Sequence, residues 1–284
     1  MIFLLLAVVG GVAFNQCLRY GQKHGANILA TVAVNYGVAT VVSLAILFAR
    51  GVRAGQLLDA HVIAIAFING VLYLLHLLVV LAAYQTVGVG ITAALSRAGI
   101  IVPAVAAWLA WNETMNAFRW IGLGLVPVAM VLMRRHEQGK PRLSLAGDMV
   151  LLGCFGIAGA IMTLHKYAEV HFTLDQREVY KSLLFAVATA AAVGYTLARR
   201  MRYSKGDVAL GVVIGLINAT MLLIILAALS KIAAVVFFPT VASLEICLNV
   251  FAARLLWRER LLKRQLLGLA IAVGVVLLTN ASSR

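Results

Sequence analysis

The chain has 284 residues, of which 63% are hydrophobic and 12% are charged. This composition excludes a soluble globular protein, because soluble domains carry about twice that share of charged residues. The formal net charge of +14 does not indicate a nucleic-acid partner, since the chain has no soluble domain that would present a basic surface.

Apolar segments long enough to cross the ~30 Å hydrocarbon core as helices recur along the chain. We predict ten transmembrane helices, at residues 2–19, 28–49, 61–84, 89–111, 117–134, 147–167, 178–198, 207–229, 233–256 and 262–280. The first begins MIFLLLAVV without an early Lys or Arg, so we expect a retained helix and not a cleaved signal. Membrane strands are excluded because the segments lack alternation of polar and apolar residues. The predicted fold class is an all-α polytopic membrane protein.

Two parts of the chain repeat. Residues 111–133 return as residues 257–279, with Trp, Glu and Gly at matching positions, and RYGQKH at 19–24 returns as KYAEVH at 166–171. We therefore predict a first five-helix repeat at 1–135, a connecting loop at 136–146 and a second repeat at 147–284. Five is an odd number of spans, so the two copies are expected to lie in the membrane with inverted topology.

The basic residues divide unevenly between the two membrane sides that this topology defines. Fifteen Lys and Arg residues fall on one side and eight on the other. The positive-inside rule makes the richer side cytoplasmic and places both termini outside. The loops at 134–146, 199–206 and 254–264 are then cytoplasmic, and the predicted location is the inner (plasma) membrane.

Ten short helices in two inverted five-helix halves resemble the EamA-like branch of the drug/metabolite transporter superfamily. Each half also has a Glu just after its fourth helix, Glu113 and Glu259, followed by a Gly-containing final helix. The resemblance covers nearly the whole chain and implies a secondary transporter that works by alternating access. Members of this superfamily commonly keep their termini in the cytoplasm, whereas the charge distribution here favours the reverse.

Polar side chains inside membrane helices cost several kcal/mol and are functional candidates for that reason. Several share a similar mid-helix depth, and we predict that they line a substrate site: Arg97, Glu245, His76, Asn69, Tyr73, Asn218, Asn249 and Asn15. A substrate carboxylate or phosphate suits Arg97, and a substrate amine or a coupling proton suits Glu245. The alternative for these two residues is a structural ion pair.

The remaining candidates also have two interpretations each. His76 suits proton coupling, as does Glu245, but His76 also suits an ordinary hydrogen bond between helices. The asparagines suit either substrate binding or interhelical bonding. Tyr180 and Lys181, at the predicted start of the seventh helix, are gate or cavity candidates.

Residues near helix ends have simpler explanations. Lys166 is expected to extend its ammonium group to the membrane interface. Glu113 and Glu259 are expected to cap the next helix. The close packing of helices is predicted for the glycine pairs Gly153/Gly156 and Gly211/Gly215.

The sequence thus predicts transport of a small polar metabolite, zwitterionic or anionic and amino-acid-like, with protons as a possible coupling ion. The alternative is export of amphipathic drugs or of lipid-linked or sugar metabolites. An enzyme is not predicted, because no catalytic cluster is present, and no glycine loop for ATP is found. No cofactor and no metal are expected. The expected partners are the substrate and the lipid bilayer, with the chain a monomer or homodimer.

Overall fold

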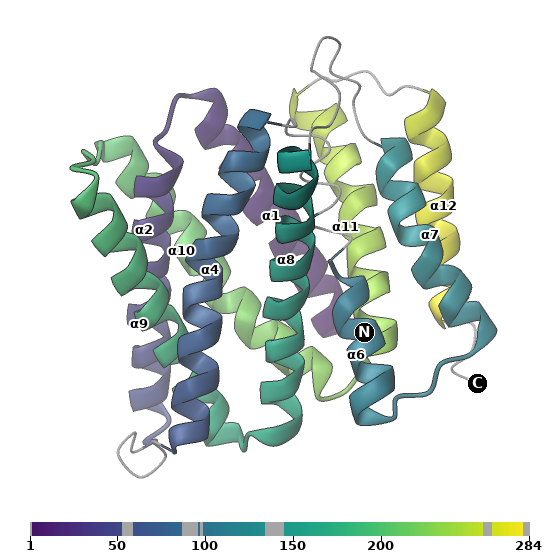
Figure 1. Ribbon diagram of the computed structural model, residues 1–284, viewed down its shortest axis with the longest axis horizontal. Coiled ribbons are helices and arrows are strands. Elements are labelled where there is room, and N and C mark those ends of the chain that lie inside the picture. Colours follow the sequence, from purple (N-terminus) through teal and green to yellow (C-terminus); the bar gives the residue numbers. More distant parts are fainter. Residues whose placement is uncertain are drawn as a thin grey trace. The chain divides into compact units, whose positions relative to one another are not determined.

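The computed structural model describes residues 2–52, 59–86, 96, 99–133, 145–257 and 263–280. This part of the chain forms ten helices and contains no strand (Figure 1). The helices are α1 (Ile2–Lys23), α2 (Ile28–Ala49), α4 (Ala60–Thr86), α6 (Ile101–Trp111), α7 (Ala117–Met133), α8 (Leu145–His171), α9 (Leu174–Ala198), α10 (Lys205–Leu229), α11 (Ala234–Trp257) and α12 (Lys263–Asn280). The predicted all-helical fold class is confirmed.

Six helices are long and apolar enough to cross a membrane, namely α1, α2, α4, α8, α9 and α10. The other four described helices contain shorter apolar stretches. A helix suits lipid because it satisfies its backbone N–H and C=O groups within one segment. The fourth predicted span, 89–111, lies only partly within the described residues, as α6.

Helix ends differ from the predicted ends where polar residues continue a helix beyond its apolar run. The helix α8 continues to His171, and α9 begins at Leu174 and not at 178. A capping box fixes the start of α9: Gln176 N donates to Thr173 Oγ1 over 3.3 Å, and Thr173 N donates to Gln176 Oε1 over 3.0 Å. This box places Glu178 and Lys181 one to two turns inside α9.

The chain divides into two compact units. Unit 1 comprises Met1–Leu74 and Tyr167–Ala227, and unit 2 comprises Leu75–Lys166 and Ala228–Arg284. Each unit therefore combines a segment from the first half of the sequence with one from the second half. The division into repeats at 1–135 and 147–284 concerns sequence correspondence, and it stays a prediction.

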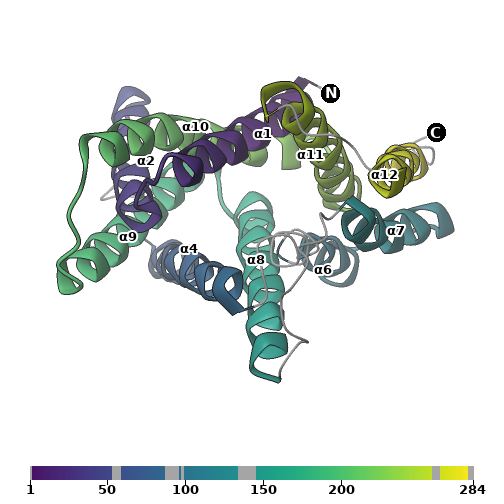
Figure 2. The same ribbon diagram turned by 90° about the horizontal axis from the view of Figure 1, so that it is seen from above.

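Unit 1 is held by close packing of α2 against α9 and α10, which lie beside α2 in both views (Figures 1 and 2). At one end of α10, Asp207 is buried and its carboxylate accepts the backbone N–H groups of Asn27 and Ser204, over 2.8 and 2.9 Å. Asn27 in turn caps α2 by accepting the N–H of Ala30. One carboxylate thus fixes the starts of both helices.

Unit 2 has an apolar core where α7, α11 and α12 meet, and Figure 2 shows α7 beside α12. Its buried members are Val126, Ala129, Ala242, Ile246, Ala272 and Val275. On α8, Gly159 packs so closely against Val102 of α6 that an added Cβ would lie 2.5 Å from the valine Cβ. The predicted glycine Gly156 has no neighbour within 4 Å of such a Cβ, so its packing role is not supported.

Candidate functional site

Four helices of unit 1 carry polar residues whose hydrogen bonds join neighbouring helices more than one turn from each helix end. We call this set the polar cluster; its members are Asn35 and Tyr36 of α2, Asn69 and Tyr73 of α4, Tyr180 of α9 and Asn218 of α10. Three of them, Asn69, Tyr73 and Asn218, are predicted site residues.

The centre of the polar cluster is a hydrogen bond between fully buried side chains. Asn69 Nδ2 donates to Tyr180 Oη over 2.6 Å, joining α4 to α9. Asn69 lies about 13 Å along α4 from its start at Ala60, at ~1.5 Å per residue. Burying an amide between apolar helices without a hydrogen bond costs about 1–3 kcal/mol, and this bond compensates for that cost.

The other members of the polar cluster join α2 to its neighbours. Tyr36 Oη donates to the carbonyl of Tyr73 over 3.3 Å, and the two rings meet edge to face with centroids 5.8 Å apart. The ring of Tyr73 also meets that of Phe185 edge to face. Asn218 Nδ2 donates to Asn35 Oδ1 over 3.2 Å. The polar cluster therefore combines amide and phenol groups with aromatic faces.

Two predicted asparagines bond within their own helices. Asn15 Nδ2 donates to the carbonyl of Gly11 over 2.6 Å, and Asn249 Nδ2 donates to the carbonyl of Glu245 over 2.8 Å. Each bond is of the ordinary i to i−4 kind that polar side chains form on helices. Neither of these two bonds joins one helix to another.

Two ionisable candidates for proton coupling lie in unit 2. Glu245 of α11 and His76 of α4 are both half-buried. The Nε2 atom of His76 is buried and has no hydrogen-bond partner among the described residues. Arg97, the predicted partner of Glu245, lies outside the described residues.

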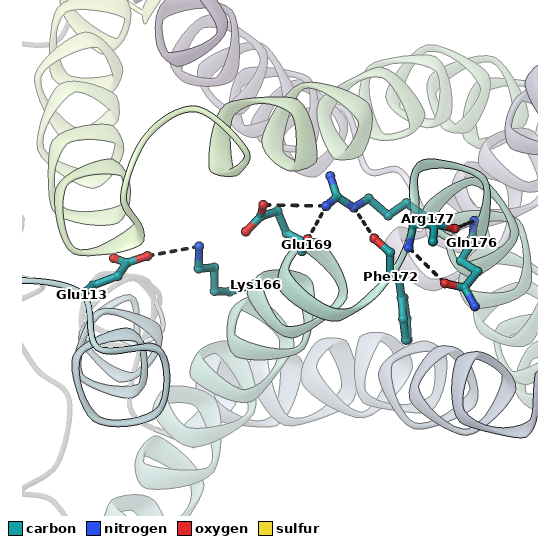
Figure 3. Close-up of polar contacts among 7 residues, drawn as sticks. Glu113, Lys166, Glu169, Phe172, Gln176 and Arg177 are labelled. Atoms are coloured by element: carbon teal, nitrogen blue, oxygen red, sulfur yellow. Dashed lines mark hydrogen bonds and ion pairs between the residues drawn. The ribbon is translucent and has the colours of Figure 1, made fainter.

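The junction between α8 and α9 is fixed by Arg177 (Figure 3). Its guanidinium donates to the carbonyls of Phe172 and Glu169, and Nη2 lies 3.7 Å from Glu169 Oε1. The last carbonyls of α8 have no partner within the helix and carry its negative dipole end, so a cation here stabilises the helix end.

A buried ion pair in unit 2 corrects two predictions. Lys166 Nζ lies 3.0 Å from Glu113 Oε1, and the two side chains are 7% and 13% exposed (Figure 3). The prediction that Lys166 reaches the interface is wrong, because α8 continues past it to His171. Glu113 does cap a helix, but the helix is α11: Glu113 Oε2 accepts the N–H of Val235 over 2.9 Å. Its repeat counterpart Glu259 lies outside the described residues.

Sequence reasoning did not include Asn35, Tyr36 or Glu178 among the site residues. Asn35 and Tyr36 occupy the positions that match Tyr180 and Lys181 in the repeat. This correspondence could have identified Asn35 and Tyr36 as site residues, because three of these four residues belong to the polar cluster and only Lys181 does not. For Glu178 the signal was the capping pattern of Thr173 and Gln176, which moves the start of α9 and places Glu178 inside it.

Comparisons with known proteins show which family and which relative this sequence is similar to. Residues 1–135 match the model of the EamA-like transporter family. A curated relative, an uncharacterized protein of Haemophilus influenzae (strain ATCC 51907 / DSM 11121 / KW20 / Rd), is 23% identical over 279 residues, which are 96% of this chain and 95% of the relative. The first 135 residues of the chain are therefore similar to the EamA-like transporter family. Together with the six helices that are long and apolar enough to cross a membrane, this match indicates a multi-pass membrane protein similar to transporters.

The fold of this protein also occurs in a solved crystal structure. The two chains superpose with a TM-score of 0.82 at 11% sequence identity, covering 99% of this protein and 96% of the other chain. At this identity the likeness concerns the fold alone. It supports the predicted all-helical fold and leaves the substrate open.

Proposed function

We propose that this protein is a secondary active transporter that moves a small zwitterionic or anionic metabolite, similar to an amino acid, by alternating access. The observation that carries the proposal is the polar cluster of unit 1. Four apolar helices place amide and phenol groups there, away from their ends. Membrane helices rarely carry such groups without a functional reason.

The chemistry of the polar cluster suits a small polar solute. Asn and Tyr side chains both donate and accept hydrogen bonds, so they exchange partners with a substrate at little net cost. The aromatic edges of Tyr36, Tyr73 and Phe185 offer apolar contact to its carbon skeleton. Charge recognition is proposed for Arg97 and Glu245, and proton coupling for Glu245 and His76.

The proposal is tested by a thermal-shift screen of the purified transporter in lipid nanodiscs. The probes are L-amino acids, simple amines, sugar phosphates, nucleotides and cationic amphiphiles. A ligand that binds only the folded state stabilises it, by about 2.7 kcal/mol at a hundredfold excess over Kd. Stabilisation by amino acids supports the proposal, whereas stabilisation by amphiphiles alone would favour the alternative, export of amphipathic or lipid-linked compounds.

Replacing Glu245 by Gln is expected to weaken binding of an amino-acid probe by about tenfold or more, because a charged hydrogen bond to the probe ammonium contributes about 1.5–3 kcal/mol. If the carboxyl also carries the coupling proton, uptake into proteoliposomes loses its dependence on pH. Both quantities are measured with the probe that the thermal-shift screen identifies. The matched control is Asp175→Asn, which neutralises an exposed carboxylate on α9. Unchanged affinity together with unchanged pH dependence would make Glu245 a structural residue.

A further inference from the structure

Three charged side chains of unit 1 meet near the start of α9. Glu178 Oε1 lies 3.0 Å from Nη1 of Arg50, the residue that ends α2, and Glu178 Oε2 lies 2.6 Å from Lys181 Nζ. The Arg50 side chain is 54% exposed, whereas those of Glu178 and Lys181 are 6% and 4% exposed. One buried carboxylate is therefore shared by a solvated cation and a buried cation.

The buried contact lies within a single helix. Glu178 and Lys181 are three residues apart on α9, and Glu178 Oε2 lies 2.6 Å from Lys181 Nζ. The charge partner of the Lys181 ammonium is thus a carboxylate that also pairs with Arg50. Burying an ammonium group costs several kcal/mol unless its partners satisfy it well.

Two other acidic residues near this end of unit 1 are already engaged, and Asp175 on the first turn of α9 is exposed. Glu169 pairs with Arg177, and Asp59 accepts the N–H groups of His61 and Val62 at the start of α4. Within the described residues, the ammonium of Lys181 therefore faces one carboxylate that it shares with Arg50. The group carries a net charge of +1, next to the positive end of the α9 dipole.

We propose that Lys181 binds the anionic group of the transported metabolite, a carboxylate, by exchanging Glu178 for it. Arg50 keeps Glu178 neutralised during the exchange, so no buried charge is left unpaired. With the substrate carboxylate in place, two cations face two anions. Lys181 directly follows Tyr180, whose hydroxyl accepts the hydrogen bond of Asn69, so the anion would bind beside the polar cluster. This inference rests on the proposed function and adds a residue to its site.

The test measures binding of amino-acid probes to the purified transporter and four variants. The probes are the L-amino acids that stabilise the wild-type protein, the carboxamide of each, and succinate. Lys181→Gln is expected to weaken binding of the carboxylate probes roughly 10- to 100-fold, because it removes a charge-assisted hydrogen bond. Lys181→Arg is expected to retain most of the affinity. The matched control Lys205→Gln removes a charge from the exposed start of α10 and is expected to change nothing.

The variant Glu178→Gln gives the sharpest test, because its expected effect has the opposite sign. It removes the carboxylate that competes for Lys181, so carboxylate probes are expected to bind more tightly, on the order of tenfold. The carboxamides are expected to show no such gain. A purely structural ion pair would instead lose binding in both Lys181→Gln and Glu178→Gln. If Lys181→Gln does not fold, the direction of the affinity change in Glu178→Gln still tests the proposed role of Lys181.

The outcomes separate this inference from the proposed function. Equal binding of carboxylate probes to the wild type and to Lys181→Gln would overturn the role of Lys181 and leave amino-acid transport standing. Equal binding of an amino acid and its carboxamide to the wild type would also overturn it. Stabilisation by amphiphiles alone would overturn both.

Discussion

Replacing Glu113 by Gln is expected to destabilise the transporter by about 3–5 kcal/mol, the usual cost of removing one partner of a buried ion pair. Lys166 would keep its charge while its side chain is 7% exposed. The Gln carbonyl oxygen can still accept the N–H of Val235, so the substitution isolates the charge from the cap of α11. The measurement is the free energy of unfolding in mild detergent, or the apparent Tm where unfolding is irreversible.

The double variant Glu113→Gln/Lys166→Met separates charge from packing. Neutralising both partners of a buried pair is often close to neutral for stability, so the double variant is expected to recover most of the loss. The control Lys205→Met removes a positive charge at an exposed position and is expected to cost little. A double variant that is less stable than either single variant would show that the pair itself does not determine the loss.

Adding a methyl group at Gly215 is expected to be the next most damaging change, costing about 1–3 kcal/mol through overpacking. A Cβ there would lie 2.7 Å from both the carbonyl oxygen of Asn35 and the Cβ of Val38. Backbone cannot move aside as a flexible side chain can, so α10 would have to shift from α2. The shift would also stretch the bond from Asn218 to Asn35, which is 3.2 Å long.

The matched control for Gly215→Ala is Gly194→Ala on α9, where an added Cβ has no neighbour within 4 Å. Ala has a higher helix propensity than Gly by about 1 kcal/mol, so this variant is expected to keep or raise the Tm. The two variants are compared by thermal unfolding under the same conditions. Equal Tm values for both would contradict the close approach of α2 and α10.

Helix positions were predictable because the length of an apolar run is a strong and local signal. The ends of α8 and α9 were not, because there polar residues continue the helices beyond the apolar runs. Thr173 and Gln176 cap α9 before its apolar run begins, and α8 continues through Lys166 to His171. The same displacement explains the wrong expectation for Lys166, which was placed at a helix end and lies buried within one.

The candidate site was predictable in its residue types and not in its pairings. Asn69, Tyr73 and Asn218 stood out because polar groups in apolar runs are rare. Their partners come from distant parts of the chain: Tyr180 is 111 residues from Asn69, and Asn35 is 183 residues from Asn218. Such pairings depend on which helix faces pack together, and a single sequence does not specify this.

The most direct test of transport is counterflow in proteoliposomes. Vesicles containing the purified protein are loaded with an unlabelled L-amino acid that stabilises it in the thermal-shift screen, and uptake of the same labelled amino acid is followed. Alternating access predicts uptake that saturates with concentration, needs the internal amino acid, and falls sharply in Lys181→Gln. Uptake that is linear in concentration and independent of the internal amino acid, or no uptake above protein-free vesicles, would contradict a transporter of amino-acid-like metabolites.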